Sequence, residues 1–190
     1  MTLTLMTQGA VATKLLEQLI AQHPLLRAHA IHVRDGGRFG GGCFSVARTI
    51  LCLRREPVVV LVDMDSDEPE YMADRRQMLE ELLAETGPPW AWRLILWVPE
   101  VEILFFQDEQ LLLELVKPAR PSARQLHKAR KSPRRILSDL LDSVEADTPE
   151  ALFQRLASLD VSALWNVPEL RVLEDFLLAR LRPQRPAPAL

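Results

Sequence analysis

Three aspartates at alternate positions follow an apolar stretch in the middle of the chain. Val58–Val62 is an unbroken apolar run, and Asp63, Asp65 and Asp67 come directly after it. Such a run predicts a strand that is buried on both faces, and side-chain alternation lets the three carboxylates point the same way. Because clustered like charges need a cation or protons, we expect either a site for Mg²⁺ (or Mn²⁺), which prefer oxygen ligands, or an acidic loop in solvent.

A second acidic pair follows the next apolar stretch. Glu100 and Glu102 come after Trp90–Val98 and Pro99. If both apolar stretches are parallel strands, their carboxyl ends meet at one edge of the sheet, where ligands bind in open α/β folds. Carboxylates from two strand ends could hold magnesium, which polarises a phosphoryl oxygen and activates water for phosphodiester chemistry. The alternative is that the two glutamates complement the positive end of a helix dipole.

A glycine-rich loop offers a candidate for phosphate contact. Residues 34–42 hold five of the seven glycines of the chain, together with Arg34 and Arg38. Glycine permits positive φ and close approach of the backbone to a phosphate. The spacing matches neither a Walker A loop nor a dinucleotide fingerprint. The loop is therefore either a flexible connector or a phosphate contact through Arg34 and Arg38.

A basic segment lies further along the chain. Residues 117–135 contain eight Lys or Arg and His127, with no Asp or Glu. Such a segment can follow a nucleic-acid backbone by counterion release, although a solvated face or a docking surface for an acidic partner explains it equally well. The cations that we assign to phosphate binding are Lys128, Arg130, Lys131 and Arg134.

Hydrophobic spacing predicts the elements that position these residues. Strands are expected at 2–7, 29–33, 58–62 and 90–98, with helices at 10–22, 44–54 and 70–85 between them. This alternation predicts a mainly parallel four-stranded sheet, flanked by helices and followed by a helical region with helices at 133–143, 149–158 and 168–181. The predicted organisation is an α/β domain at 1–116, a basic helical region at 117–182 and a proline-rich tail at 183–190.

Composition excludes several classes of protein. Hydrophobic residues make up 48% and charged residues 26% of the 190 residues, which is typical of a globular protein. The only cysteines are Cys43 and Cys52, which excludes a disulfide scaffold and a zinc cage. No apolar run is long enough to span a membrane, and the start of the chain does not resemble a signal peptide. We therefore expect a cytoplasmic protein without a membrane partner.

The order of these motifs resembles the Toprim-like family. The motifs are Leu5–Gly9 at the end of the first strand, Val62–Asp65 at the end of the third and Pro99–Glu102 after the fourth. The chain is most similar to small stand-alone Toprim-like proteins that are encoded beside ATPases in prokaryotic defence loci. Lys131–Pro133 at the start of the helical region also fits, and the resemblance covers residues 2–140.

The resemblance implies a fold, a metal and a set of site residues. It implies a Toprim-like fold with Mg²⁺ (or Mn²⁺), DNA or RNA as the substrate and an ATPase as a partner. The implied metal ligands are Asp63, Asp65, Asp67 and Glu100, and the implied catalytic residues are Asp63, Asp65, Glu102 and Gln8.

Gln8 is the one departure from the family pattern, because the family has a glutamate at this position. An amide accepts a hydrogen bond but supplies no charge to a cation and takes no proton at neutral pH. Two hypotheses follow. The first is a metal-dependent, nuclease-like protein that acts on nucleic-acid phosphodiesters, in phage or mobile-element defence. The second is a catalytically reduced Toprim scaffold that works as the binding partner of an ATPase.

Overall fold

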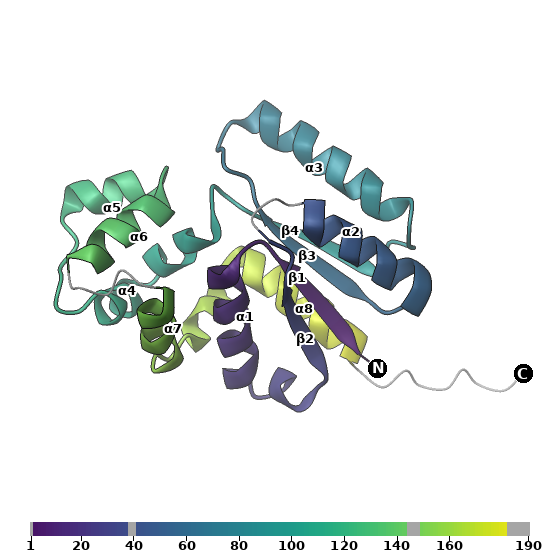
Figure 1. The fold of residues 1–190 in the computed structure, drawn as a ribbon, viewed down its shortest axis with the longest axis horizontal. Helices are drawn as coiled ribbons and strands as arrows, with labels where there is room; N and C mark the ends of the chain where they lie inside the picture. The colour runs from purple at the N-terminus through teal and green to yellow at the C-terminus, as the bar shows by residue number, and fades with distance from the viewer. Residues whose placement is uncertain (1, 38–40, 144–148, 182–190) are drawn as a thin grey trace, which may run out of the picture.

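A parallel four-stranded sheet forms the centre of the molecule (Figure 1). The structure, a computed structural model, describes residues 2–37, 41–143 and 149–181. The strands are β1 (Leu3–Thr7), β2 (Ile31–Asp35), β3 (Val58–Asp63) and β4 (Trp92–Trp97), in the order β2-β1-β3-β4. The predicted α/β class and parallel sheet are confirmed.

Helices cover both faces of the sheet. Figure 1 shows α1 (Ala10–Gln22) and α8 (Pro168–Leu181) on one side, and α2 (Gly41–Thr49) and α3 (Pro69–Ala84) on the other. A π-helical turn, η2 (Ile50–Arg54), continues α2 toward β3. This double cover explains why β3 has no polar residue before its last position.

The two faces of the sheet have separate apolar cores, because successive side chains of a strand point to opposite faces. Leu61 of β3 packs in the cluster with α1 and α8, whereas Val60 and Val62 pack in the cluster with α2 and α3. Leu61, Val60 and Val62 are all fully buried. The unbroken apolar run therefore has partners on both sides.

The remaining helices lie beyond the carboxyl ends of β3 and β4 or pack beside α1 (Figure 1). They are η3 (Val101–Phe106), α4 (Glu109–Leu115), α5 (Ala123–Ala129), α6 (Pro133–Asp142), α7 (Pro149–Ala157) and η4 (Ser162–Asn166), while a short turn, η1 (Leu26–Ala28), precedes β2. Helices α6, α7 and α8 were predicted, but α4 and α5 were not. No described helix is long and apolar enough to cross a membrane.

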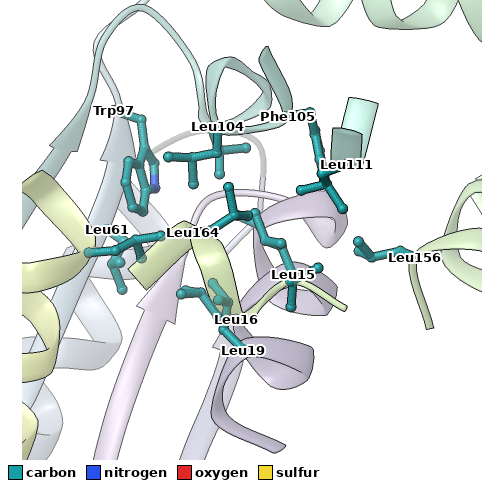
Figure 2. Close-up of a cluster of buried hydrophobic side chains, with 14 of the residues drawn as sticks. Leu15, Leu16, Leu19, Leu61, Trp97, Leu104, Phe105, Leu111, Leu156 and Leu164 are labelled. Atoms are coloured by element: carbon teal, nitrogen blue, oxygen red, sulfur yellow. The ribbon is translucent and has the colours of Figure 1, made fainter. Parts of the chain in front are cut away.

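A large apolar core joins the sheet to these helices. Figure 2 shows Leu15 and Leu16 of α1 in one buried cluster with Leu61 of β3, and Leu156 of α7 and Leu164 of η4 belong to the same cluster. Hydrogen bonds add to this packing. The Gln22 side chain donates to the Leu159 carbonyl at 2.7 Å and accepts from the Val161 amide at 2.8 Å. The predicted domain boundary near residue 117 therefore lies within a shared core, and the division remains a prediction.

Candidate functional site

The end of β3 places Asp63 beside the chain that leaves β4. Asp63 pairs in register with Trp97, the last residue of β4. The loop after β3 is held there, because the Met64 and Asp65 amides donate to the Pro99 carbonyl at 3.1 and 2.9 Å. The Val101 amide, at the start of η3, donates to Asp63 Oδ1 at 2.9 Å. The carboxylate of Asp63 is thus fixed at the junction between β3 and η3.

Three carboxylates meet at this junction, and Arg134 lies among them. The Arg134 guanidinium donates from Nη2 to Asp63 Oδ2 at 2.6 Å and from Nε to Glu102 Oε1 at 3.0 Å, and its Nη1 lies 3.2 Å from Glu100 Oε1. The Arg134 backbone amide also donates to Glu100 Oε2 at 3.1 Å. The side chains of Asp63 and Glu102 are 1% and 5% exposed, whereas that of Arg134 is 52% exposed. The guanidinium therefore covers two buried acids.

Helix α6 positions Arg134 for these contacts. Ser132 is the N-cap of α6 and Pro133 is at its first position, so that Arg134 lies in the first turn. The first backbone amides of a helix have no partner within the helix and attract anions. Glu100 supplies the anion by accepting the Arg134 amide. Backbone and side chain of one residue therefore hold α6 against the end of the sheet.

Burial and crowding change the ionisation of the cluster. Burial, with the charge of Glu102, raises the pKa of Asp63 to about 7, although the Val101 amide and Arg134 favour its charged form. Burial also raises the pKa of Glu100, opposed by Arg134. Burial alone would lower the pKa of Arg134. The hydrogen bond to Glu102 and the charges of the three acids outweigh burial and raise this pKa above its ordinary value. One guanidinium does not balance three carboxylates, and the raised pKa of Asp63 brings its titration close to neutral pH.

Gln8, at the end of β1, lies next to Asp63. Its Oε1 accepts the Asp63 amide at 3.3 Å. A neutral amide at this position contributes no charge to the cluster. A glutamate would add a negative charge beside a group of acids that already exceeds its cation. With Gln8 at this position, the cluster carries one negative charge less than it would with a glutamate.

The three aspartates differ in their burial. Asp63 is buried, whereas Asp65 and Asp67 are exposed. The expectation from alternation is wrong because the strand ends at Asp63 and Asp65 has a left-handed backbone with φ of 55°. The buried Asp63 and Glu102 and the partly buried Glu100 form the cluster instead, with Gln8 beside Asp63.

Magnesium is the metal that the resemblance implies for this site. Carboxylate oxygens are suitable ligands for Mg²⁺, but here a guanidinium lies among them. Within residues 2–37, 41–143 and 149–181, no three His, Cys, Asp or Glu side chains are placed so that they could hold a metal ion. In this arrangement the site does not fit Mg²⁺ or Mn²⁺.

A pocket of about 460 Å³ opens beside the cluster. Its lining includes Asp65, Glu100, Lys131, Arg134 and Arg135. Two predicted phosphate-binding residues, Lys131 and Arg134, are thus brought next to the carboxylates. The pocket contains both signs of charge, and its cations come from the turn between α5 and α6 and from the start of α6.

The other predicted phosphate contacts lie elsewhere. Lys128 and Arg130, in α5 and just after it, are exposed, as is Arg34 on β2. Strand β1 separates β2 from β3, so Arg34 is not part of the carboxylate cluster. Arg38 lies outside the described residues.

Asp35 was not singled out from the sequence. Its Oδ1 accepts the Gly9 amide at 3.0 Å and the Gly37 amide at 2.8 Å, so one carboxylate fixes the turns after β1 and β2. Gly9 and Gly37 both have positive φ, which glycine adopts without a steric penalty. An aspartate directly before two glycines at a strand end was the available signal.

The fold is of the Toprim-like α/β class, with a parallel four-stranded sheet that helices cover on both faces. No protein-family model and no curated protein matches the sequence. Among solved structures, the chain is similar to the C-terminal region of the Burkholderia pseudomallei OLD protein, with 17% identity and a TM-score of 0.57 over 93% of this chain and 96% of that one. The C-terminal region of the Xanthomonas campestris pv. campestris OLD protein is also similar, with 17% identity and a TM-score of 0.51 over 93% and 94%. At these identities the similarity concerns the fold.

Proposed function

We propose that this chain is a catalytically reduced Toprim-like protein that binds nucleic-acid phosphodiesters without cleaving them. The proposal rests on Arg134, which lies among the three carboxylates where a cleavage site would require a metal. Gln8 supports it, since the position offers no charge to a cation. With a guanidinium among its carboxylates, the site does not support the metal-dependent phosphodiester cleavage that a magnesium site would perform.

The binding surface in this proposal is the basic segment 117–135. All eight of its Lys and Arg side chains are exposed, and the ion pairs described there involve Lys117 and Arg134. Lys131, Arg134 and Arg135 line the pocket beside the cluster. Exposed cations of this kind neutralise phosphates and release counterions, independently of base sequence.

Binding is tested by fluorescence anisotropy with labelled single-stranded and double-stranded oligonucleotides at several salt concentrations. The variant Lys128→Ala/Arg130→Ala/Lys131→Ala is expected to weaken binding about tenfold or more and to reduce the slope of log affinity against log salt by about 2–3. Unchanged affinity and an unchanged salt slope in this variant contradict a role of the segment in binding.

A matched control removes three cations from other elements. Arg27, Arg48 and Arg54 are exposed and lie in η1, α2 and η2. Arg27→Ala/Arg48→Ala/Arg54→Ala changes the net charge by the same amount. Its affinity is expected to remain within about twofold of the wild type, because only long-range attraction is lost. An equal loss in both triple variants would indicate nonspecific attraction rather than a defined surface.

Metal-dependent cleavage is the second candidate function, and the convergence of Asp63, Glu100 and Glu102 favours it. Plasmid and single-stranded RNA are incubated with Mg²⁺ or Mn²⁺ and the wild type, Asp63→Ala/Asp65→Ala or Gln8→Glu. The binding proposal predicts no cleavage by the wild type. Cleavage by the wild type that is lost in the double variant supports the nuclease, whereas cleavage that appears only in Gln8→Glu supports a reduced scaffold.

The resemblance also motivates an ATPase partner and a place in phage or mobile-element defence. Both belong to the binding proposal, since a scaffold without its own cleavage activity needs a partner that acts. Co-purification of the untagged chain with a tagged ATPase from the same gene neighbourhood tests this part. Failure of the two proteins to associate removes the ATPase from the proposal and leaves nucleic-acid binding in place.

A further inference from the structure

We infer that Arg134 is the permanent cation of this carboxylate site and that its guanidinium excludes divalent metal from it. The inference rests on the proposed function and deepens it. If Arg134 takes the place of a metal, the protein can bind nucleic acid but cannot cleave it by metal-dependent chemistry. Every nitrogen of the guanidinium faces a carboxylate oxygen. Nε faces Glu102, Nη1 faces Glu100 and Nη2 faces Asp63.

The arrangement of donors differs from what a metal requires. A magnesium ion needs oxygens that converge on one point at about 2.0–2.1 Å. Around Arg134 the oxygens lie 2.6–3.2 Å from three different nitrogens of a planar group. A guanidinium presents its donors as a fixed planar fork, which suits carboxylates. The three acids are therefore spread around a plane, where they satisfy one arginine.

The anchoring of Arg134 makes the occupancy permanent. Its backbone amide is bound by Glu100, the same carboxylate that faces Nη1. Withdrawal of the side chain would leave Asp63 and Glu102 buried without their cation, and such uncompensated charges are strongly destabilising. The Arg134 guanidinium, which links α6 to the end of the sheet, thus takes the position that a metal ion would need.

The net charge of the cluster predicts the effect of replacing Arg134. At a pH above the pKa of Asp63, where all three carboxylates are ionised, they and the guanidinium carry a net charge of −2, and Arg134→Met leaves −3. Once the planar guanidinium is gone, the three carboxylate side chains are free to turn toward one point, where a divalent cation would restore the balance. The variant is therefore expected to be less stable than the wild type in EDTA and to regain stability in Mg²⁺ or Mn²⁺.

The experiment measures metal binding and thermal unfolding together. Wild type, Arg134→Met and the matched control Arg135→Met, whose exposed arginine is the next residue of α6, are compared by Mn²⁺ titration calorimetry and by melting in EDTA or Mn²⁺. Arg134→Met is expected to bind Mn²⁺ about tenfold or more tightly than the wild type, since a neighbouring positive charge has been removed. The wild type and Arg135→Met are expected to melt at the same temperature in EDTA and in Mn²⁺.

Several outcomes would overturn the inference. One is a wild-type melting temperature that rises in Mg²⁺ or Mn²⁺ as much as that of Arg134→Met. Another is an Arg134→Met variant that is folded by circular dichroism yet binds Mn²⁺ no better than the wild type. A variant that stays unfolded in Mn²⁺ as well as in EDTA also overturns it, because the metal should replace the guanidinium.

A second variant separates charge from geometry. Arg134→Lys keeps the positive charge but has a single nitrogen, which cannot face three carboxylates at once. It is expected to melt below the wild type and to gain no Mn²⁺ affinity. Gain of Mn²⁺ affinity in this variant contradicts the exclusion of metal by charge. Nucleic-acid binding is measured separately by anisotropy, so failure of the proposed function leaves these metal readouts unchanged, and the reverse holds as well.

Discussion

Replacing the buried aspartate of the site with its neutral isostere should change how stability depends on pH. The pKa of Asp63 is raised from its ordinary 3.8 to about 7, first by burial and then by the charge of Glu102. Between these pH values the folded protein holds a proton that the unfolded chain releases. The free energy of unfolding therefore falls as pH rises, by about 1.4 kcal/mol per pH unit and by at most about 4 kcal/mol over the interval.

Asp63→Asn removes this titration while its Oδ1 can still accept the Val101 amide. We expect the wild type to lose up to about 4 kcal/mol relative to the variant between about pH 4 and pH 7. Urea unfolding at several pH values, followed by tryptophan fluorescence, measures the difference, and Trp97 pairs in register with Asp63 as a local probe. The exposed Asp65→Asn variant is the matched control and should follow the wild-type curve. A constant difference between wild type and Asp63→Asn across this range would refute the reasoning.

Three further predictions concern the site and its support. Glu102→Gln should lower the pKa of the buried aspartate, because the charge of Glu102 raises it, and carboxyl NMR titration that shows no movement contradicts this. Ser122→Ala breaks the capping box of α5 and should cost about 1 kcal/mol of unfolding free energy in urea; Ser132→Ala, at an N-cap without a side-chain bond, should cost less. Leu16→Ala, at a position that is 0% exposed, should cost about 2–5 kcal/mol in the same assay, whereas Leu53→Ala, which is 79% exposed, should change it by about 0.5 kcal/mol or less.

The sheet could be predicted because its signals are local. The apolar run before Asp63 identified β3, and turn residues separated it from its neighbours. The strand order β2-β1-β3-β4 could not be predicted, because hydrophobic spacing does not state which strands pair. Helix α5 was missed for a related reason: it has seven residues and lies in a segment dominated by charge, where periodicity is weak.

The site was predicted in part. Glu100 and Glu102 were expected to join Asp63 at the carboxyl edge of the sheet, and they do. Arg134 was expected to contact phosphate, because a basic residue in a basic segment gives no sign of an acidic partner 71 residues earlier. The left-handed backbone at Asp65 was equally invisible, since Asp adopts both conformations. Local patterns therefore located the acids but not their cation.

The Arg134 contacts join residues that are far apart in the chain, and this separation affects the order in which the parts of the protein fold. Arg134 meets Glu102 across 32 positions of the chain and Asp63 across 71. Loops of this length must close before the contacts stabilise anything, and contacts between distant residues slow folding. The cluster is therefore expected to form late, after β3, β4 and α6 have come together. In stopped-flow refolding, formation of the Arg134–carboxylate cluster would show when the helical region packs against a sheet that is already assembled.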